Sequence, residues 1–497
     1  MNKMKKYIYK ITKALSYTIV VFGAYSCGDM YLEDVEVYNI DSENYFNSES
    51  DYYDALVGAY DLMQSTYVNA ILGEIASDNT VSGGESATDV VGWQQIDEMV
   101  HTPVNSNLRD VWNWMYAGVS RTNFILEFED KTEFDGRDAL IAETRFLRAY
   151  YYFELVKWFG DVPLKESRFL IGDETTVPRS PAADVYALIE NDLKFAVANL
   201  TYIAPQSGRA TKGSAQALLG KAYLYQKKYA EATSVLDDLI EMGPYDLVED
   251  YEMLWEAEGE NSVEAVFEVQ YTDVEGASFD CLQCSEGNVA IGFSGIRNYT
   301  GPLFSSGFSF NLPTQESYDA FEDSDLRRDI AILDIEAWAA QEGATFATGY
   351  KHTGFFNRKY IPRKRSSEAA GDLNLTNPGN YRAIRFADVL LMAAEAYNTG
   401  GISDTKAQEY LNKVRRRAYG VDDNSVDITN TGANLTADIV RERRLELMGE
   451  GHRFFDLVRT GDGSRIPGFQ EGKNNVFPIP IEEIQFANGN WDQNPNY

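Results

Sequence analysis

Aromatic and polar side chains outside the predicted helices are the residues of this chain best suited to bind a ligand. The chain has 7 Trp, 32 Tyr and 26 Phe residues, and most fall in helical registers typical of a core. A sugar ring stacks its axial hydrogens on an aromatic face and offers its hydroxyls to carboxylates, amides or guanidinium groups. The loop residues that supply such groups are Trp93, Tyr299 and Trp338 for stacking, with Asp78, Asn79 and Gln94 for hydrogen bonding. For each of them, a loop-anchoring aromatic or a capping polar side chain is an equally open interpretation.

Catalytic and metal-binding motifs are absent from the sequence. The three histidines, His101, His352 and His452, lie in no HExxH motif and beside no nucleophile elbow. With 77 acidic residues, two carboxylates close in sequence carry almost no weight as a glycosidase pair. The acidic runs 323–325 and 422–423 lack the full calcium loop, so they indicate solvated loop acids, although a structural calcium stays open. We expect no catalysis, no metal site and no cofactor.

The charge balance favours neutral ligands. The chain carries 44 basic and 77 acidic residues, a formal net charge of −33. Nucleic acid is not expected as a partner, because its phosphates require a basic surface. Polyanionic glycans are disfavoured for the same reason. A neutral glucan or fructan fits this charge better.

The N-terminus has the pattern of an export signal. Five lysines and no acid precede an apolar stretch from Ala14 to Tyr25, followed by Ser26 and Cys27. The stretch is too short for a bilayer, which needs about 20 residues. We predict a lipoprotein signal peptide over 1–26 and a lipid on Cys27, whose three acyl chains would anchor the protein stably. An ordinary secretory signal followed by an unrelated cysteine is the alternative.

Helical periodicity dominates the remaining chain and predicts a mostly α fold. The predicted helical scaffold covers about 45–66, 108–258 and 381–460. Between these parts lie two loop-rich segments, 67–107 and 259–380, with a few strand-like runs; they are named here the first and second excursions, and loops of this kind commonly carry binding function. No Pro-, Ser- or Gly-rich linker divides 27–497, which favours a single unit.

One pair of helices shows how the scaffold is built. Residues 215–225 and 229–240 predict two antiparallel helices with a tight turn at Lys227 and Lys228, and small residues such as Gly220 allow them to approach closely. The pattern resembles a tetratricopeptide repeat, without a strict 34-residue period along the chain. An irregular array of helix pairs is expected.

Two of the three cysteines form a CxxC, Cys281 and Cys284. In an exported protein the first interpretation is a disulfide. A metal site would need further ligands, and a redox site would need a βαβ pattern that the sequence lacks.

Three long segments follow one another in the second half of the chain: NPGNYRAIRFADVLLMAAEAYN at 377–398, IVRERRLELMGEGHRFFDLVRTG at 439–461 and FPIPIEEIQFANGNWDQNPNY at 477–497. In this order they resemble the SusD/RagB family of outer-membrane nutrient-binding lipoproteins. The stretches 112–123 and 142–151 also look like that family, so the resemblance spans nearly the whole mature chain. The family-like residues are expected to be scaffold, with their charges paired between helix turns. These are Arg385, Asp388, Glu442, Arg443, Gly451, Arg453, Asp456 and Arg459.

The resemblance implies a surface-exposed, lipid-anchored protein of the outer membrane that binds an oligo- or polysaccharide. It also implies a partner, a SusC-like TonB-dependent transporter, over which the protein sits as a lid. The loop around Trp93 corresponds to a segment that helps form the glycan site in the family, and Tyr299 and Trp338 fall in the excursion that supplies the opposing aromatic wall. The RagB branch implies peptide or other nutrient binding instead, and a helix-array scaffold for another protein is a third hypothesis.

Overall fold

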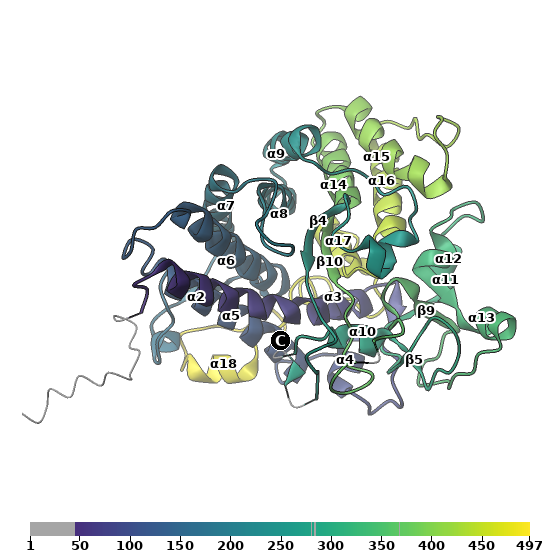
Figure 1. Cartoon of the computed structure of the whole chain (residues 1–497), viewed down its shortest axis with the longest axis horizontal. Coiled ribbons are helices and arrows are strands. Elements are labelled where there is room, and N and C mark those ends of the chain that lie inside the picture. Colours follow the sequence, from purple (N-terminus) through teal and green to yellow (C-terminus); the bar gives the residue numbers. More distant parts are fainter. Residues whose placement is uncertain (1–44, 280, 283–284, 367) are drawn as a thin grey trace, which may run out of the picture.

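The computed structural model describes residues 45–279, 281–282, 285–366 and 368–497. Helices make up most of its regular structure, which confirms the mostly α prediction (Figure 1). The longer helices are α2 (Glu49–Asp61), α3 (Thr66–Ile75), α5 (Ser106–Leu126), α6 (Arg137–Phe159), α7 (Ala182–Asn199), α8 (Lys212–Tyr225), α9 (Tyr229–Met242), α14 (Phe386–Thr399), α15 (Asp404–Tyr419) and α16 (Gly432–Glu446). The shorter ones are α4 (Val91–Asp97), α10 (Val289–Ser294), α11 (Gln315–Asp319), α12 (Arg328–Ala331), α13 (Ile335–Glu342), α17 (Arg453–Thr460) and α18 (Ile481–Phe486).

Short strands pair two by two in the described ranges. The antiparallel pairs are β1 (Thr80–Val81) with β7 (Leu312–Pro313), β2 (Val162–Pro163) with β3 (Arg179–Ser180), β4 (Ala265–Val269) with β10 (Tyr381–Arg385), and β8 (Ile332–Asp334) with β9 (Phe355–Asn357). β5 (Ile296–Arg297) and β6 (Ser306–Gly307) are parallel. Three pairs lie within or join the excursions, so strands mainly fix the loops to one another.

Consecutive helices pack side by side along the scaffold: α5 on α6, α6 on α7, α7 on α8, α8 on α9, and α14 on both α9 and α15. The pair α8 and α9 confirms the predicted helix–turn–helix. Thr211 caps α8 through its side chain, and Lys227 takes the left-handed conformation that turns the chain into α9. A methyl group on Gly220 would lie 2.4 Å from Leu236, so only glycine permits this close approach.

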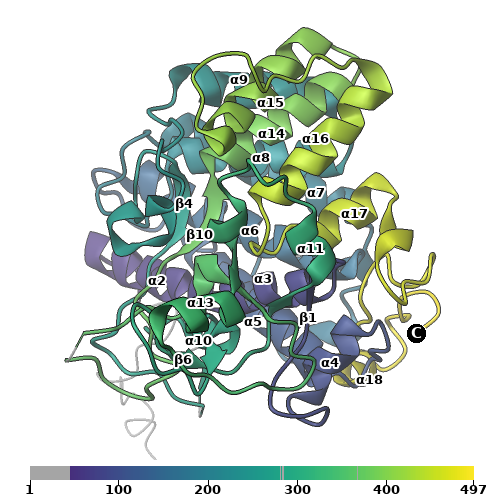
Figure 2. The ribbon, with the colours of Figure 1, turned by 90° about the vertical axis from the view of Figure 1, so that its right-hand side faces the viewer.

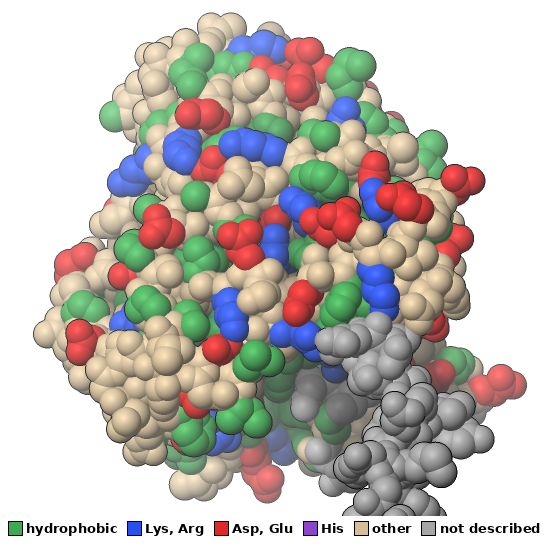
Figure 3. Space-filling view, turned by 90° about the vertical axis from the view of Figure 1, so that its left-hand side faces the viewer, with side chains coloured by type: hydrophobic (Ala, Val, Ile, Leu, Met, Phe, Trp, Pro, Cys, Tyr) green, Lys and Arg blue, Asp and Glu red, His purple; other side chains and the backbone are tan. Residues whose placement is uncertain are grey.

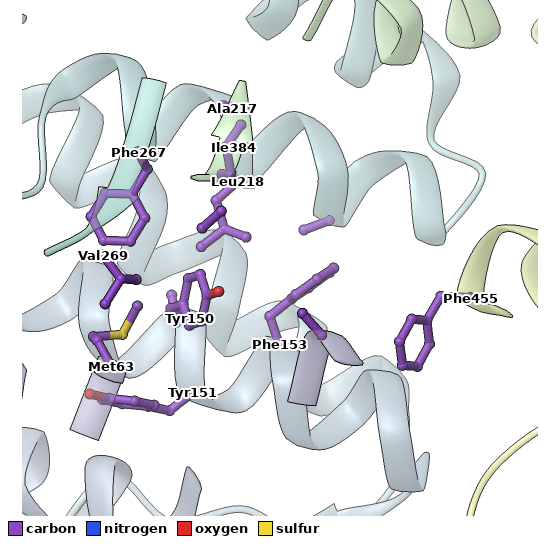
Figure 4. Packing of buried hydrophobic residues seen from close by; sticks show 14 of the residues in the cluster. Met63, Tyr150, Tyr151, Phe153, Ala217, Leu218, Phe267, Val269, Ile384 and Phe455 are labelled. Atoms are coloured by element: carbon purple, nitrogen blue, oxygen red, sulfur yellow. The ribbon is translucent and has the colours of Figure 1, made fainter. Parts of the chain in front are cut away.

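The main core lies where the helix pairs meet the β4–β10 pair. Tyr150 of α6 points toward Leu218 of α8, with Phe267 of β4 and Ile384 of β10 near them and Phe153 about one turn further along α6 (Figure 4). All five side chains are buried. Burying a large apolar side chain contributes about 1.5 to 3 kcal/mol, so this junction holds the two halves of the scaffold together.

Charged side chains of the family-like C-terminal helices are buried and paired. Arg385 donates to Glu450, Glu446 and Glu264 at 2.6 to 2.9 Å. The other predicted scaffold residues follow the same principle: Arg443 pairs with Asp388 and Asp456, Arg453 with Asp78, Arg459 with Asp456, Glu442 with Arg327 and Arg415, and the Gly451 N–H donates to Glu74. These residues lie within the scaffold, as predicted, but the expected pairing between turns of one helix is wrong for most of them. Among these pairs only Arg459 with Asp456 lies within one helix.

The outer surface carries both signs of charge. Acidic and basic side chains are interspersed over the face shown in Figure 3, despite the strongly negative total. Within the described ranges, the chain forms no helix of the length and apolar character that spanning a membrane requires. The predicted signal peptide and Cys27 lie outside those ranges.

Candidate functional site

The two excursions meet on one face of the molecule, below the C-terminal helix pairs (Figure 2). Strand β1 of the first pairs with β7 of the second. The Gly84 N–H donates to the Ser309 carbonyl at 2.8 Å, and the Tyr350 N–H donates to the Gly84 carbonyl at 2.9 Å. Segments more than 200 residues apart therefore form one continuous surface.

A small hydrophobic cluster, separate from the main core, supports the second excursion. Tyr299 and Phe304 belong to it, and Trp338 of α13 and Phe346 pack against it from outside. The Trp338 indole N–H donates to the Tyr299 hydroxyl at 2.9 Å, and that hydroxyl donates to the Pro302 carbonyl at 2.8 Å. The structure thus brings Tyr299 and Trp338 together, as predicted.

These two aromatic residues have different exposure. Tyr299 is 7% exposed and is enclosed by its own loop, where a methyl group on Gly301 would lie 2.5 Å from its hydroxyl. Trp338 is half-buried, with its ring 5.2 Å from Phe304. Trp338 therefore keeps part of its ring available to a ligand, while Tyr299 orients it through the hydrogen bond.

Trp93 does not lie on this surface, contrary to the sequence-based expectation. It lies in the first turn of α4 and is 2% exposed, with its ring centroid 5.1 Å from that of Phe293 and 5.3 Å from that of Phe310. Its indole fills the space between the two excursions, because both neighbouring rings come from the second one. In this conformation neither face of the ring can stack on a sugar.

The three predicted hydrogen-bonding residues are likewise engaged inside the protein. Asp78 accepts two bonds from Arg453, at 2.7 and 2.8 Å. Asn79 accepts from Arg444 and donates to Glu74. Gln94 donates to the Gly83 carbonyl at 2.5 Å within the first excursion, whereas Asp78 and Asn79 tie that excursion to α17 and α16. None of the three offers an exposed rim to a ligand.

Burial and charge act in opposite directions on Asp78. Burial raises the pKa of this carboxyl, but Arg453, with Arg444 and Arg465 nearby, more than offsets it and lowers the pKa below its ordinary value. Asp78 is therefore an ionised member of the scaffold's charge pairs. The arginines that bind it follow in the chain by more than 360 residues, which no local pattern reveals.

Other residues than those predicted provide the exposed groups. Phe346 packs with Trp338 against the small cluster, and Tyr350, four residues further on, is also half-buried. Arg297 lies 3.6 Å from Asp89 and 3.9 Å from Glu85. We call Glu85, Asp89, Arg297, Trp338, Phe346 and Tyr350 the excursion face. The only signal for Phe346 and Tyr350 in the sequence is their place in the same loop-rich segment as Trp338. Together these residues offer aromatic surface beside groups that bond hydroxyls.

Histidine and cysteine contribute no site in the described part of the chain. Burial lowers the pKa of His101 to about 4 and that of His452 to about 3, so both are neutral packing groups. No group of three or more His, Cys, Asp or Glu in the described ranges is placed to hold a metal ion. Cys281 is in a disulfide, and its predicted partner Cys284 lies outside the described residues.

Comparison with known proteins identifies relatives of this architecture. A family described as "SusD family" matches residues 334–473, and one described as "Starch-binding associating with outer membrane" matches 31–224. By sequence, SusD-like protein P25 of Formosa agariphila is 23% identical over 96% of this chain and 97% of its own length. The starch-binding protein SusD of Bacteroides thetaiotaomicron is also 23% identical, over 99% of both chains.

Solved structures agree with the sequence matches. A laminarin binding SusD-like protein is 34% identical, with a TM-score of 0.83 over 91% of this chain and 100% of its own. Surface glycan-binding protein A from Bacteroides thetaiotaomicron, in complex with laminarihexaose, is 26% identical with a TM-score of 0.80, over 90% of this chain and 100% of its own. The laminarin binding SusD-like protein is matched over its full length at 34% identity. The chain therefore belongs to the SusD/RagB family.

Proposed function

We propose that this protein captures a neutral glucan on its excursion face. The observation that carries the proposal is the half-buried Trp338, which Tyr299 holds and which packs with Phe346 against the same cluster. Arg297 lies two residues before Tyr299, and its carbonyl accepts from the Ala347 N–H at 2.9 Å. The exposed part of the Trp338 ring face would stack on the apolar face of a sugar ring. Arg297, Asp89 and Glu85 would bond the hydroxyls, and a guanidinium 3.6 Å from a carboxylate offers both a donor and an acceptor there.

The names of the relatives support this ligand class. One is titled a laminarin binding protein, and another is bound to laminarihexaose. Laminarin is a neutral glucan, in line with the formal charge of −33 of this chain. The relatives are named as binding proteins, and this protein is not an enzyme; capture alone requires no activated acid or base.

The proposed place of action is the cell surface at the outer membrane. A lipid on Cys27 would anchor the protein, and a SusC-like TonB-dependent transporter would receive the glycan as the lid closes. This part of the proposal is supported by the export signal of the sequence and by the family's described association with the outer membrane. Labelling of Cys27 by a radioactive fatty acid, lost in Cys27→Ser, would test the anchor.

Isothermal titration tests the binding function. The purified protein is titrated with laminarin, starch, a fructan and a peptide mixture. We expect binding to one neutral polysaccharide in the micromolar to millimolar range, about 4 to 8 kcal/mol. Trp338→Ala should weaken it about tenfold, while Phe486→Ala, an exposed aromatic on α18 outside the excursion face, should leave it within twofold.

Two results would replace the proposal. Affinity for peptides with none for glycans would assign the protein to RagB-like nutrient uptake. Equal glycan affinity in Trp338→Ala and the parent protein, with both folded, would move the site away from the excursion face. Co-purification of the anchored protein with its barrel, tested separately, addresses the transporter whichever ligand binds.

A further inference from the structure

A groove lined by aromatic residues lies far from the excursion face. It has a volume of about 380 Å³ and runs between α5, the loop after β2 and α18. In Figure 1, α18 lies at the lower left and α13, which carries Trp338, at the lower right. The volume falls within the range of small-molecule sites. Nothing in the excursion face contributes to its lining.

Four aromatic residues from three parts of the chain form its walls. Trp112 and Tyr116 of α5 have ring centroids 4.8 Å apart, and Trp491 lies 6.2 Å from Trp112. Phe169 meets Tyr116 edge to face at 5.4 Å. The polar atoms of two of these residues are already bonded within the protein: the Tyr116 hydroxyl donates to Pro163 and the Trp491 N–H to Val177. Trp112 and Trp491 are buried and support the wall from behind, while the half-buried rings of Tyr116 and Phe169 present apolar, electron-rich surface to the groove.

Two carboxylates, Glu174 and Glu483, complete the lining. In the described part of the chain neither forms an ion pair with lysine or arginine, whereas the adjacent Glu482 pairs with Arg109 at 3.1 Å. Burial raises the pKa of Glu483, Glu482 and Glu174 raise it further, and a hydrogen bond from Trp112 opposes them. Glu174 accepts one bond, from the Gly172 N–H at 2.9 Å.

The nearest basic side chains are held elsewhere. Lys165 lies 5.6 Å from the Phe169 ring centroid and pairs with Asp173. Arg179 donates to the carbonyls of Asp161 and Asp492 and to the side chain of Asn494. In the described part of the chain, the carboxylates of Glu174 and Glu483 therefore have no lysine or arginine bound to them.

We propose that this groove binds a protonated amino sugar. Its ammonium group would lie between Glu174 and Glu483, where it supplies the missing positive charge and hydrogen-bond donors. Aromatic rings attract a cation through the negative potential of their faces, and the same rings stack on the apolar face of a pyranose. Asn113, exposed at the mouth of the groove, can bond the hydroxyls. A neutral sugar would leave the two carboxylates without a counter-charge.

Titration of the purified full-length protein with three matched sugars tests the charge. D-Glucosamine at pH 6.5 should bind at least tenfold more tightly than D-glucose or N-acetyl-D-glucosamine, which share its ring and lack the ammonium. Equal affinity for the three sugars, or no binding of glucosamine, would overturn the proposal. Tighter binding of Nα-acetyl-lysine amide than of glucosamine would also overturn it, since the groove would then recognise a protein side chain.

Three variants locate the site. Glu483→Gln keeps the shape of the carboxylate and should weaken glucosamine binding at least tenfold, while Glu482→Gln, its neighbour bound to Arg109, should stay within twofold. Phe169→Ala should weaken it about fivefold without unfolding the protein, because Phe169 is half-buried. Unchanged affinity in Glu483→Gln would overturn the assignment. Laminarin titration of the same variants keeps this result separate from the excursion face, whose affinity should not change.

Discussion

Arginine has two different surroundings in this protein, one in the C-terminal helices and one on the excursion face. Arg385 is 1% exposed and is bonded to three glutamates. Glu446 ends α16, Glu450 follows that helix, and Glu264 directly precedes β4. Arg297 ends β5, lies 3.6 and 3.9 Å from the carboxylates of Asp89 and Glu85, and donates to the Phe308 carbonyl at 3.0 Å. The first arrangement is closed to a ligand, and the second leaves donors and acceptors incompletely bonded.

The difference explains where specificity can vary within this fold. A buried charge that loses its partner is costly, so the residues around Arg385 depend on one another. Exposed charge pairs contribute less, so replacement of Glu85 or Asp89 is expected to disturb the scaffold less. The same helical frame can thus carry different ligand preferences, because the excursions and not the helices supply the contacts.

Removing Arg385 should have the largest effect on stability. Arg385→Ala leaves Glu264, Glu446 and Glu450 buried without this partner and should lower the free energy of unfolding by about 4 kcal/mol. Arg441→Ala, which breaks an exposed pair with Glu322, should lower it by less than about 0.5 kcal/mol. Urea unfolding followed by circular dichroism measures both. A loss below about 1 kcal/mol in Arg385→Ala would contradict a structural role for the buried pairs.

Trp93→Ala should follow closely in magnitude. The indole is enclosed by Phe293 and Phe310, so its removal leaves a cavity between the excursions and should cost about 3 kcal/mol. Trp338→Ala, which removes a half-buried ring, should cost about half as much. The same unfolding experiment compares them. If the two variants lost equal stability, Trp93 would not be the packing residue that the structure shows.

The helices could be predicted from the sequence because their signals are local. Periodic apolar residues, small residues such as Gly220 and the Lys227 turn lie within one helix pair and gave its position to within a few residues. The family-like residues were likewise predicted to be scaffold, but with partners on neighbouring turns of one helix, whereas Arg443 of α16 pairs with Asp456 of α17. Pattern and structure agree wherever the partners are near in the chain.

The site was harder to predict because its partners are distant. Trp93 occurs in a polar, glycine-rich stretch typical of a surface loop, but Phe293 and Phe310 cover it from the second excursion. In the sequence, Asp78 and Asn79 resemble free polar groups of a loop. The structure places Arg453 beside Asp78 and Arg444 beside Asn79. Composition marks a segment as irregular, and it does not say which of its side chains point inward.

Acid should destabilise the protein through His101, a buried residue near the end of the first excursion. Burial lowers the pKa of His101 to about 4, with Lys473 acting in the same direction. Because unfolded histidine titrates near 6.5, the unfolded state binds the extra proton between pH 6.5 and 4, and stability falls as the pH falls. The contribution of His101 should reach about 2 kcal/mol at pH 5 relative to pH 7.5.

Unfolding free energies at the two pH values, in the parent protein and in His101→Gln, measure this contribution. His101 bonds the Tyr497 hydroxyl at 2.8 Å, and glutamine can retain a polar contact without titrating. We expect a shallower fall in the variant. An identical pH dependence in both proteins would assign the acid sensitivity to other groups, such as His452.

Two aspartates of the first excursion provide the finest test of the comparison. Asp78 is buried against Arg453, and Asp89 is partly exposed beside Arg297. Asp78→Asn should lower the free energy of unfolding by about 2 kcal/mol, because a charged pair is lost, and should leave the glycan affinity of the folded protein unchanged. Asp89→Asn should alter stability by less than about 0.5 kcal/mol and weaken glycan binding about threefold. Urea unfolding and calorimetric titration of both variants separate the two roles. Two aspartates eleven positions apart would then have different roles, one in stability and the other in ligand binding. If the two results were reversed, the ligand-binding surface would lie at Asp78 and not at Asp89.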